Sequence, residues 1–225
     1  MSIQLSDLIQ NNAIFKHLTD PEQAELIRLA NRKALKRGES LFYQGDDWRG
    51  VLMIASGTLR SIIYAPDGRI YSVSTWEAGA DFWAHTLFDH EGMPSTLEAV
   101  KSSVVYQWPG EETFNLVLGN RAATRALLRR QTEMIRKRRQ NIYELAFNPV
   151  ASRLAKLVID KFENAESPTV QRDLTLEEMA AMIASSPEVI CRTLYQFQNE
   201  GIIEVNRASI TLHNREALLN LMSEE

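Results

Sequence analysis

The clearest hydrophobic pattern lies at residues 175–201, where apolar positions form two helical stripes separated by a short break. The first stripe consists of Met179, Ala180, Met182 and Ile183. The second consists of Val189, Ile190, Thr193, Leu194 and Phe197. Two helices this short and this closely joined pack at a steep angle, so the pattern predicts a helix-turn-helix.

Capping signals support both helices. Thr175 and Glu178 form an S/T-x-x-E capping box, in which each side chain binds a free backbone N–H at the helix start. Ser186 is placed to cap the second helix, and Pro187 occupies its first position, where a missing N–H costs nothing. Gly201 marks the end of that helix.

Glu188 and Arg192 lie four residues apart and therefore share one face of the second helix. Their spacing alone is typical of a surface ion pair worth a few tenths of a kcal/mol. The capped turn before them instead favours a helix that reads DNA in the major groove. Both interpretations stay open from these two residues.

A hairpin is expected directly after this helix. Residues 202–205 and 210–213 have the pattern of two strands, and residues 206–209 between them have the pattern of a turn. With residues 186–194, SPEVICRTL, it resembles the winged helix-turn-helix of the Crp/Fnr family of bacterial transcription regulators. The resemblance implies a homodimer that binds a near-palindromic site in double-stranded DNA, with RNA polymerase as a further partner. The DNA-binding residues that it implies are Thr175, Ser185, Ser186, Pro187, Glu188, Cys191, Arg192 and Arg207.

In the first half of the chain the sequence pattern changes from helical to strand-like. Residues 2–35 are expected to be helical, whereas glycine-rich turns after residue 36 separate short apolar runs. The expected strands are residues 41–43, 51–54, 59–64, 70–76 and 103–108. We therefore predict an α+β protein whose N-terminal domain is an antiparallel β-roll of the jelly-roll type. The order of these segments resembles the family's sensor domain, so that the resemblance runs from about residue 15 to 213.

A short helix and then a long one are expected between residues 111 and 147. Residues Leu128, Ile135 and Ile142 recur every seven positions, which favours pairing with a second copy, although packing on its own domain is the alternative. The predicted dimer interface comprises Leu127, Leu128, Gln131, Ile135, Arg138, Ile142 and Leu145. Pro149 ends the helix. The expected domains are residues 1–119 (sensor), 120–147 (dimer helix) and 148–225 (DNA-binding).

Composition sets further limits. The 225 residues carry a net charge of −4, but residues 121–156 contain ten Lys/Arg and only two Asp/Glu, as expected near DNA.

Neither a signal peptide nor a membrane-length apolar run is recognised, which predicts a cytoplasmic protein without a membrane partner. Cys191, the single cysteine, excludes a disulfide framework; its place beside Arg192 would also suit an oxidant sensor.

The effector is harder to predict. In cyclic-nucleotide-binding members of the family, a Gly-Glu turn and an Arg-Ser pair hold the phosphate. The matching positions here are Gly79-Ala80 and Met93-Pro94, so we expect that cyclic AMP is not the signal. The candidate pocket comprises Gly79, Ala80, Asp81, Phe82, Trp83, Met93, Pro94, Ser95 and Leu97.

Three alternatives remain, one for the ligand of the sensor and two for the class of the whole protein. Haem held by His85 or His90, or a small apolar effector, would suit the largely apolar pocket. A cyclic-nucleotide-binding regulatory protein is disfavoured by the missing glutamate and arginine. A roll-fold metal enzyme is disfavoured because the four histidines do not cluster; no catalytic residue or metal site is predicted.

Overall fold

The computed structural model describes residues 4–163 and 165–223 and divides into two compact units. The N-terminal unit comprises residues 1–63 and 73–135, and the C-terminal unit comprises residues 64–72 and 136–225. The long helix α5 contributes to both. Within the described residues, no helix is both long enough and apolar enough to cross a membrane.

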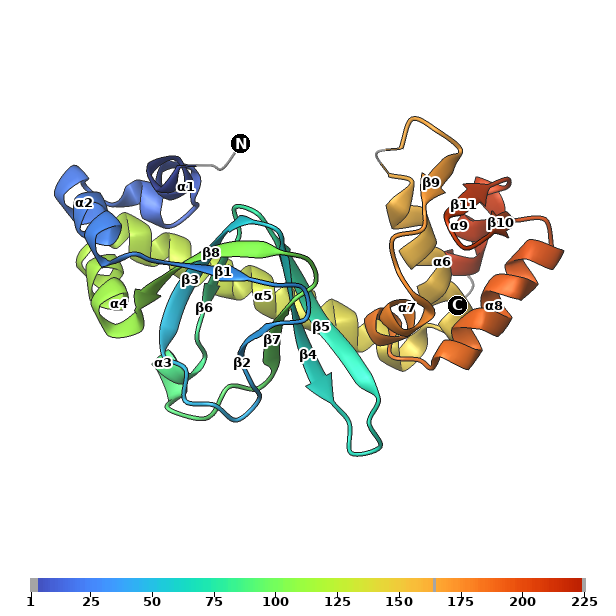
Figure 1. Ribbon diagram of the computed structural model, residues 1–225, viewed down its shortest axis with the longest axis horizontal. Coiled ribbons are helices and arrows are strands. Elements are labelled where there is room, and N and C mark those ends of the chain that lie inside the picture. The colour runs from blue at the N-terminus through green and yellow to red at the C-terminus, as the bar shows by residue number, and fades with distance from the viewer. Residues whose placement is uncertain (1–3, 164, 224–225) are drawn as a thin grey trace. The chain divides into compact units, whose positions relative to one another are not determined.

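The N-terminal unit is an antiparallel β-roll preceded by helices (Figure 1). One sheet has the order β1-β8-β3-β6 and the other the order β2-β7-β4-β5. The strands are β1 (Asn31–Leu35), β2 (Ser40–Phe42), β3 (Gly50–Ser56), β4 (Thr58–Tyr64), β5 (Ile70–Glu77), β6 (Asp81–Trp83), β7 (Thr96–Ala99) and β8 (Ser103–Pro109). Its helices are α1 (Leu5–Asn11), the 3-10 turn η1 (Phe15–His17), α2 (Asp20–Leu29), α3 (Thr86–Asp89), α4 (Gly110–Gly119) and the first part of α5 (Arg121–Phe147). The predicted β-roll and the five predicted strands are confirmed.

The expectation of helix up to residue 35 is wrong. Residues Asn31–Leu35 form strand β1, whose backbone pairs with residues 103–107 of β8. A ladder with a neighbouring strand satisfies these backbone groups, and local helical spacing cannot compete with that pairing. Helix α2 therefore ends at Leu29, with the N–H of Ala30 bonded to the carbonyl of Ile27.

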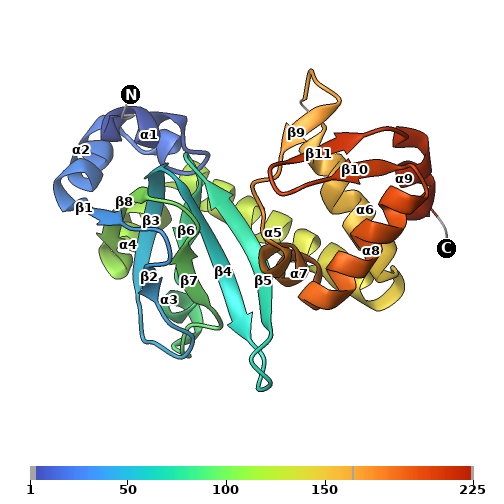
Figure 2. The ribbon, with the colours of Figure 1, turned by 45° about the vertical axis from the view of Figure 1, so that its right-hand side comes forward.

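A tight turn joins β3 to β4 and requires glycine. Gly57 has φ of 95°, in the left-handed region, and a Cβ there would lie 2.6 Å from the Cα of Ser103. The hydroxyl of Ser103 accepts a hydrogen bond from the N–H of Thr58 at 3.0 Å. This turn carries the chain from one sheet to the other, because β3 and β4 belong to different sheets (Figure 2).

The C-terminal unit is built around a second hydrophobic core. Its helices are α6 (Val150–Lys161), α7 (Leu176–Ile183), α8 (Pro187–Asn199) and α9 (Arg215–Ser223). Strands β9 (Thr169–Gln171), β10 (Ile203–Val205) and β11 (Ser209–Leu212) form a sheet in the order β10-β11-β9. The predicted helix-turn-helix and hairpin are confirmed, and β9 and α9 were not expected.

Candidate nucleic-acid interface

Helix α7 begins with the expected capping box. The hydroxyl of Thr175 accepts the N–H of Glu178 at 3.1 Å, and the Glu178 carboxylate accepts the N–H of Thr175 at 2.8 Å. The helix ends at Ala184, whose φ of 52° is left-handed, and the N–H of Ser185 then reaches the carbonyl of Ala180 at 2.9 Å. This Schellman-type end turns the chain sharply toward the next helix.

Helix α8 starts three residues after Ala184, at Pro187. The Ser186 hydroxyl accepts the N–H of Val189 at 3.4 Å, and Pro187 is the first helical residue. Its inner face buries Ile190, Thr193, Leu194 and Phe197 against α6 and α7. Met182 on α7, expected in the apolar face, is instead 39% exposed. The caps and the buried face of α8 fix which side of the helix meets solvent.

That outer side carries Glu188, Cys191, Arg192 and Tyr195, all of them exposed and spaced at three and four residues. A hydrogen bond from the Ser186 hydroxyl and one from its own backbone N–H lower the pKa of the Glu188 carboxyl below its ordinary value. Glu188 is therefore an anionic acceptor at neutral pH. No salt bridge joins Glu188 to Arg192 in the described part of the chain, so the ion-pair interpretation is not supported.

The wing places two further arginines close together. In the turn between β10 and β11, the Asn206 side-chain oxygen accepts the N–H groups of Ala208 and Ser209, each at 2.8 Å. Arg207 is exposed at the tip of this turn. The guanidinium of Arg172 donates to the carbonyl of Asn206 at 3.3 Å, which ties β9 to the tip.

The structure therefore brings together most of the sequence-predicted DNA residues. Ser185, Ser186, Pro187 and Glu188 surround the start of α8, and Cys191 and Arg192 continue its outer face. Thr175 is exposed at the start of α7, where it serves as the cap. Sequence reasoning missed Tyr195 and Arg172. The i, i+3, i+4, i+7 spacing from Glu188 could have identified the tyrosine, whereas the position of Arg172 beside the wing has no local sequence signal.

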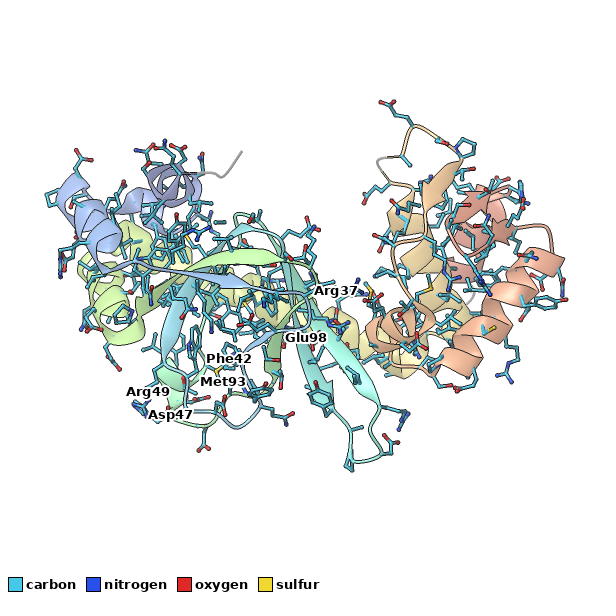
Figure 3. All side chains as sticks on the ribbon, viewed as in Figure 1. Arg37, Phe42, Asp47, Arg49, Met93 and Glu98 are labelled. Carbon is cyan, nitrogen blue, oxygen red and sulfur yellow. The ribbon has the colours of Figure 1, made fainter. Side chains whose placement is uncertain are left out.

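The interior of the β-roll is filled with aromatic and aliphatic side chains. Phe42 stacks on Trp48 at a centroid distance of 4.8 Å, and Phe82 meets Trp76 edge-on at 5.3 Å. Met93 is 1% exposed, and Figure 3 shows it with Phe42 inside the roll. By the sequence resemblance, Met93 stands at the position of a phosphate-binding arginine, and its thioether carries no charge.

The expected effector pocket is only partly assembled. Gly79 and Ala80 form the tight turn between β5 and β6, because Gly79 supplies a φ of 90°, and Pro94 is exposed on the surface. Ser95 is buried in a hydrogen bond with Ser61, and Leu97 is buried in the core. Ala84-His85 is the residue pair that directly precedes the short helix α3, and the assignment of Gly79-Ala80 to a phosphate-binding turn stays a prediction.

The remaining pocket residues lie near α5. Asp81, Phe82, Trp83 and His85 line a cavity of about 40 Å³ that is also lined by Trp76, Phe88, Arg130, Gln131 and Met134. The buried Asp81 carboxylate accepts Asn12 Nδ2 at 3.2 Å and Trp83 Nε1 at 3.0 Å, and Arg130 Nε lies 3.8 Å away. These groups stabilise the carboxylate and connect α1, β6 and α5.

This cavity is too small for haem, because drug-sized and cofactor pockets have volumes of roughly 300–1,000 Å³. His85 and His90 are both exposed, and His90 is the left-handed C-cap of α3. Haem therefore does not fit the residues present. No cluster of three metal-ligating side chains occurs within the described ranges.

Helix α5 exposes a continuous face that differs in part from the expected interface. Leu128, Ile135 and Ile142 are 63%, 69% and 67% exposed. Thr132 and Arg139 lie between them and are also exposed. Leu127 instead belongs to the core at 4% exposure, and Gln131, Arg138 and Leu145 lie on the half-buried side. The exposed face therefore follows residues 128, 132, 135, 139 and 142.

Comparison with known proteins adds independent findings. Residues 150–221 match the Crp-like helix-turn-helix domain, and residues 32–120 match the cyclic nucleotide-binding domain. The chain is 22% identical over 219 residues to the CRP-like cAMP-activated global transcriptional regulator of Mycobacterium tuberculosis (strain CDC 1551 / Oshkosh), covering 95% of this chain and 98% of that protein. It is 24% identical over 198 residues to the fumarate and nitrate reduction regulatory protein of Escherichia coli (strain K12), covering 86% and 79%. A solved transcriptional regulator from Eubacterium rectale shares the fold, with a TM-score of 0.77 at 19% identity over 94% of this chain and 98% of that one.

The turn between α7 and α8 yields a stability prediction. Ala184→Gly should raise the free energy of unfolding by roughly 0.5–1 kcal/mol, because a left-handed non-glycine residue costs about 1–2 kcal/mol and the added flexibility of the unfolded chain removes part of that gain. Ala180→Gly is the matched control and should destabilise, because residue 180 has helical φ and ψ. Urea unfolding of both variants measures the difference; a destabilised Ala184→Gly protein contradicts the argument.

Proposed function

This chain belongs to the Crp/Fnr family of transcription regulators, and we propose that it binds a near-palindromic operator as a homodimer through α8. The observation that carries the proposal is the capped recognition helix with Glu188, Arg192 and Tyr195 exposed on one face. Arginine pairs with guanine O6 and N7, and glutamate accepts from cytosine N4. Each half-site should therefore contain a G·C pair that Arg192 and Glu188 share.

The wing contributes affinity rather than sequence preference. Arg207 at its tip, with Arg172 beneath it, suits contact with the phosphate backbone, since phosphate contacts orient a protein on the duplex without reading bases. On family grounds, RNA polymerase is a further partner of the DNA-bound dimer.

Dimerisation follows from α5. Three large aliphatic side chains at seven-residue intervals would be buried by a parallel second copy, and each buried side chain contributes about 1.5–3 kcal/mol. A two-fold axis along α5 requires two half-sites in inverted repeat. Their centres should lie roughly 34–36 Å apart, one helical turn of DNA.

The signal is not cyclic AMP on this proposal. By the sequence resemblance, Met93 stands in the place of the phosphate-binding arginine, and it is buried in the same apolar core as Phe42 and Phe82. A buried phosphodiester without a compensating cation is strongly disfavoured. The interior of the roll is filled by its own side chains, which favours the absence of a ligand there, and a small apolar effector stays a prediction from the sequence.

The recognition helix can be tested with two arginine variants on an operator selected from random DNA. Arg192→Ala should weaken binding to the selected operator by about 1–3 kcal/mol and leave random DNA nearly unaffected. Arg207→Ala is the matched control: it should weaken both alike and reduce the salt slope by about 1. Fluorescence anisotropy across a salt series measures both. An equal loss on both DNAs for Arg192→Ala would restrict that residue to phosphate contact.

The dimer can be tested by placing charge on α5. Leu128→Glu combined with Ile135→Glu should leave a folded monomer, because burying two carboxylates per helix in the seam costs more than the contacts gain. Leu118→Glu is the control, since Leu118 is a 50% exposed leucine on a different helix, α4. Sedimentation velocity at micromolar concentration distinguishes monomer from dimer for each protein. A monomeric wild type, or a dimeric double variant, rules the interface out.

Calorimetry tests the signal directly. We expect no saturable heat with cyclic AMP or cyclic GMP up to millimolar concentration, because each missing charge-assisted contact removes about 1.5–3 kcal/mol. The Mycobacterium tuberculosis relative, named as cAMP-activated, is the positive control. Micromolar binding accompanied by tighter operator binding would refute this part of the proposal.

A further inference from the structure

The exposed face of α5 is strongly basic. A parallel pairing through Leu128, Ile135 and Ile142 places residues 125, 132, 139 and 146 at the other central position of the heptad. The flanking positions are residues 129, 136 and 143 on one side and 131, 138 and 145 on the other. Across these central and flanking positions the helix carries no acidic residue. It carries four exposed arginines, Arg125, Arg129, Arg136 and Arg139, and the half-buried Arg138.

The protomer does not neutralise the four exposed arginines. Within the described residues, Arg125, Arg129, Arg136 and Arg139 form no ion pair with their own chain. The two acidic residues of α5 lie elsewhere. Glu133 is exposed outside the seam positions, and Glu144 is held by Lys156 and by Gln140 at 3.1 Å. These four exposed arginines would therefore meet a second copy without an ion-pair partner on their own chain.

Pairing two copies concentrates the charge. This step rests on the dimer proposed above. At the central position, Arg139 faces the partner's Arg139, and Arg136 flanks the pair on each helix. Flanking positions of coiled coils usually carry opposite charges that form salt bridges between the helices, and here every charged flanking residue is an arginine. The aliphatic residues favour the dimer while the arginines oppose it.

We propose that a small multivalent oxyanion of the phosphate or diphosphate type binds between the two copies of α5 at Arg139 and Arg136, and that it controls dimerisation. Guanidinium groups bind phosphate oxygens in bidentate fashion, and Arg139 contributes from both helices. The site is incomplete in one protomer, because its two-fold related half comes from the second copy. It is distinct from the interior of the β-roll.

DNA is the alternative source of phosphate, and the position of Arg139 argues against it. Two helices paired through these residues pack roughly 8–10 Å apart, so a duplex cannot enter the seam between them. Arg139 lies between Ile135 and Ile142, within the seam itself. A small anion can reach that position.

The test is sedimentation equilibrium of the full chain at constant ionic strength in chloride, sulfate or inorganic pyrophosphate. We expect pyrophosphate to tighten the wild-type dimer at least about ten-fold relative to chloride, equivalent to about 1.4 kcal/mol. Arg139→Leu should dimerise more tightly than wild type in chloride and lose its response to pyrophosphate. Arg139→Gln, which adds no apolar area, should lose the response as well.

Lys137→Gln is the matched control, because Lys137 is an exposed cation on the same helix outside the seam. It should keep the full pyrophosphate response, which separates a seated anion from general screening or salting-out. An identical wild-type dissociation constant in all three buffers overturns the proposal but leaves the dimer intact. A response that survives in both Arg139 variants also overturns it. A response seen only when operator DNA is present assigns these arginines to DNA instead, whereas a monomer in every buffer removes the proposed dimer too.

Discussion

The constraint on which this structure depends is a row of large aliphatic side chains on α5 that the protomer leaves exposed. Leu128, Ile135 and Ile142 stand in solvent on one face, while the opposite face packs into the core through Ala123 and Leu127. Burying each exposed side chain would contribute about 1.5–3 kcal/mol, so a second copy is the natural partner. The same helix carries the arginines that oppose this pairing. In the proposed dimer, function would therefore depend on a balance between apolar burial and like-charge repulsion along one seam.

The orientation of helix α8 is set by local hydrogen bonds, backbone conformation and packing. Ser186 and Pro187 set the first turn of α8, and the left-handed Ala184 sets the angle at which the chain arrives. Phe197, which is fully buried, then determines the rotation of the helix about its own axis. Glu188 and Arg192 face outward as a consequence of these constraints.

Much of this could be predicted from the sequence, because capping residues and apolar spacing act over a few residues. Thr175, Glu178 and Ser186 make the hydrogen bonds that their spacing predicted. Long-range pairing was harder to predict: Asn31–Leu35 becomes strand β1 only because β8 lies beside it.

The candidate sites show the same division between local and long-range determinants. The seven-residue repeat identified Leu128, Ile135 and Ile142, but a repeat cannot tell which neighbours share their face. Thr132 and Arg139 are exposed beside them, whereas Gln131 and Arg138 turn toward their own protomer. That distinction depends on the tertiary contacts of α5 and was not visible in the sequence. Gly79 was likewise assigned to a phosphate-binding turn, and in the fold its positive φ serves the tight turn between β5 and β6, which belong to different sheets.

The most direct test of the account is disulfide cross-linking across α5 in a Cys191→Ser background. Thr132→Cys should cross-link two copies efficiently on mild oxidation, and the covalent dimer should bind the selected operator as tightly as the reduced protein. Gln131→Cys, one residue away on the half-buried side, should cross-link poorly. Preferential cross-linking at position 131, or a cross-linked Thr132→Cys dimer that no longer binds DNA, would contradict a parallel dimer that reads its operator through α8.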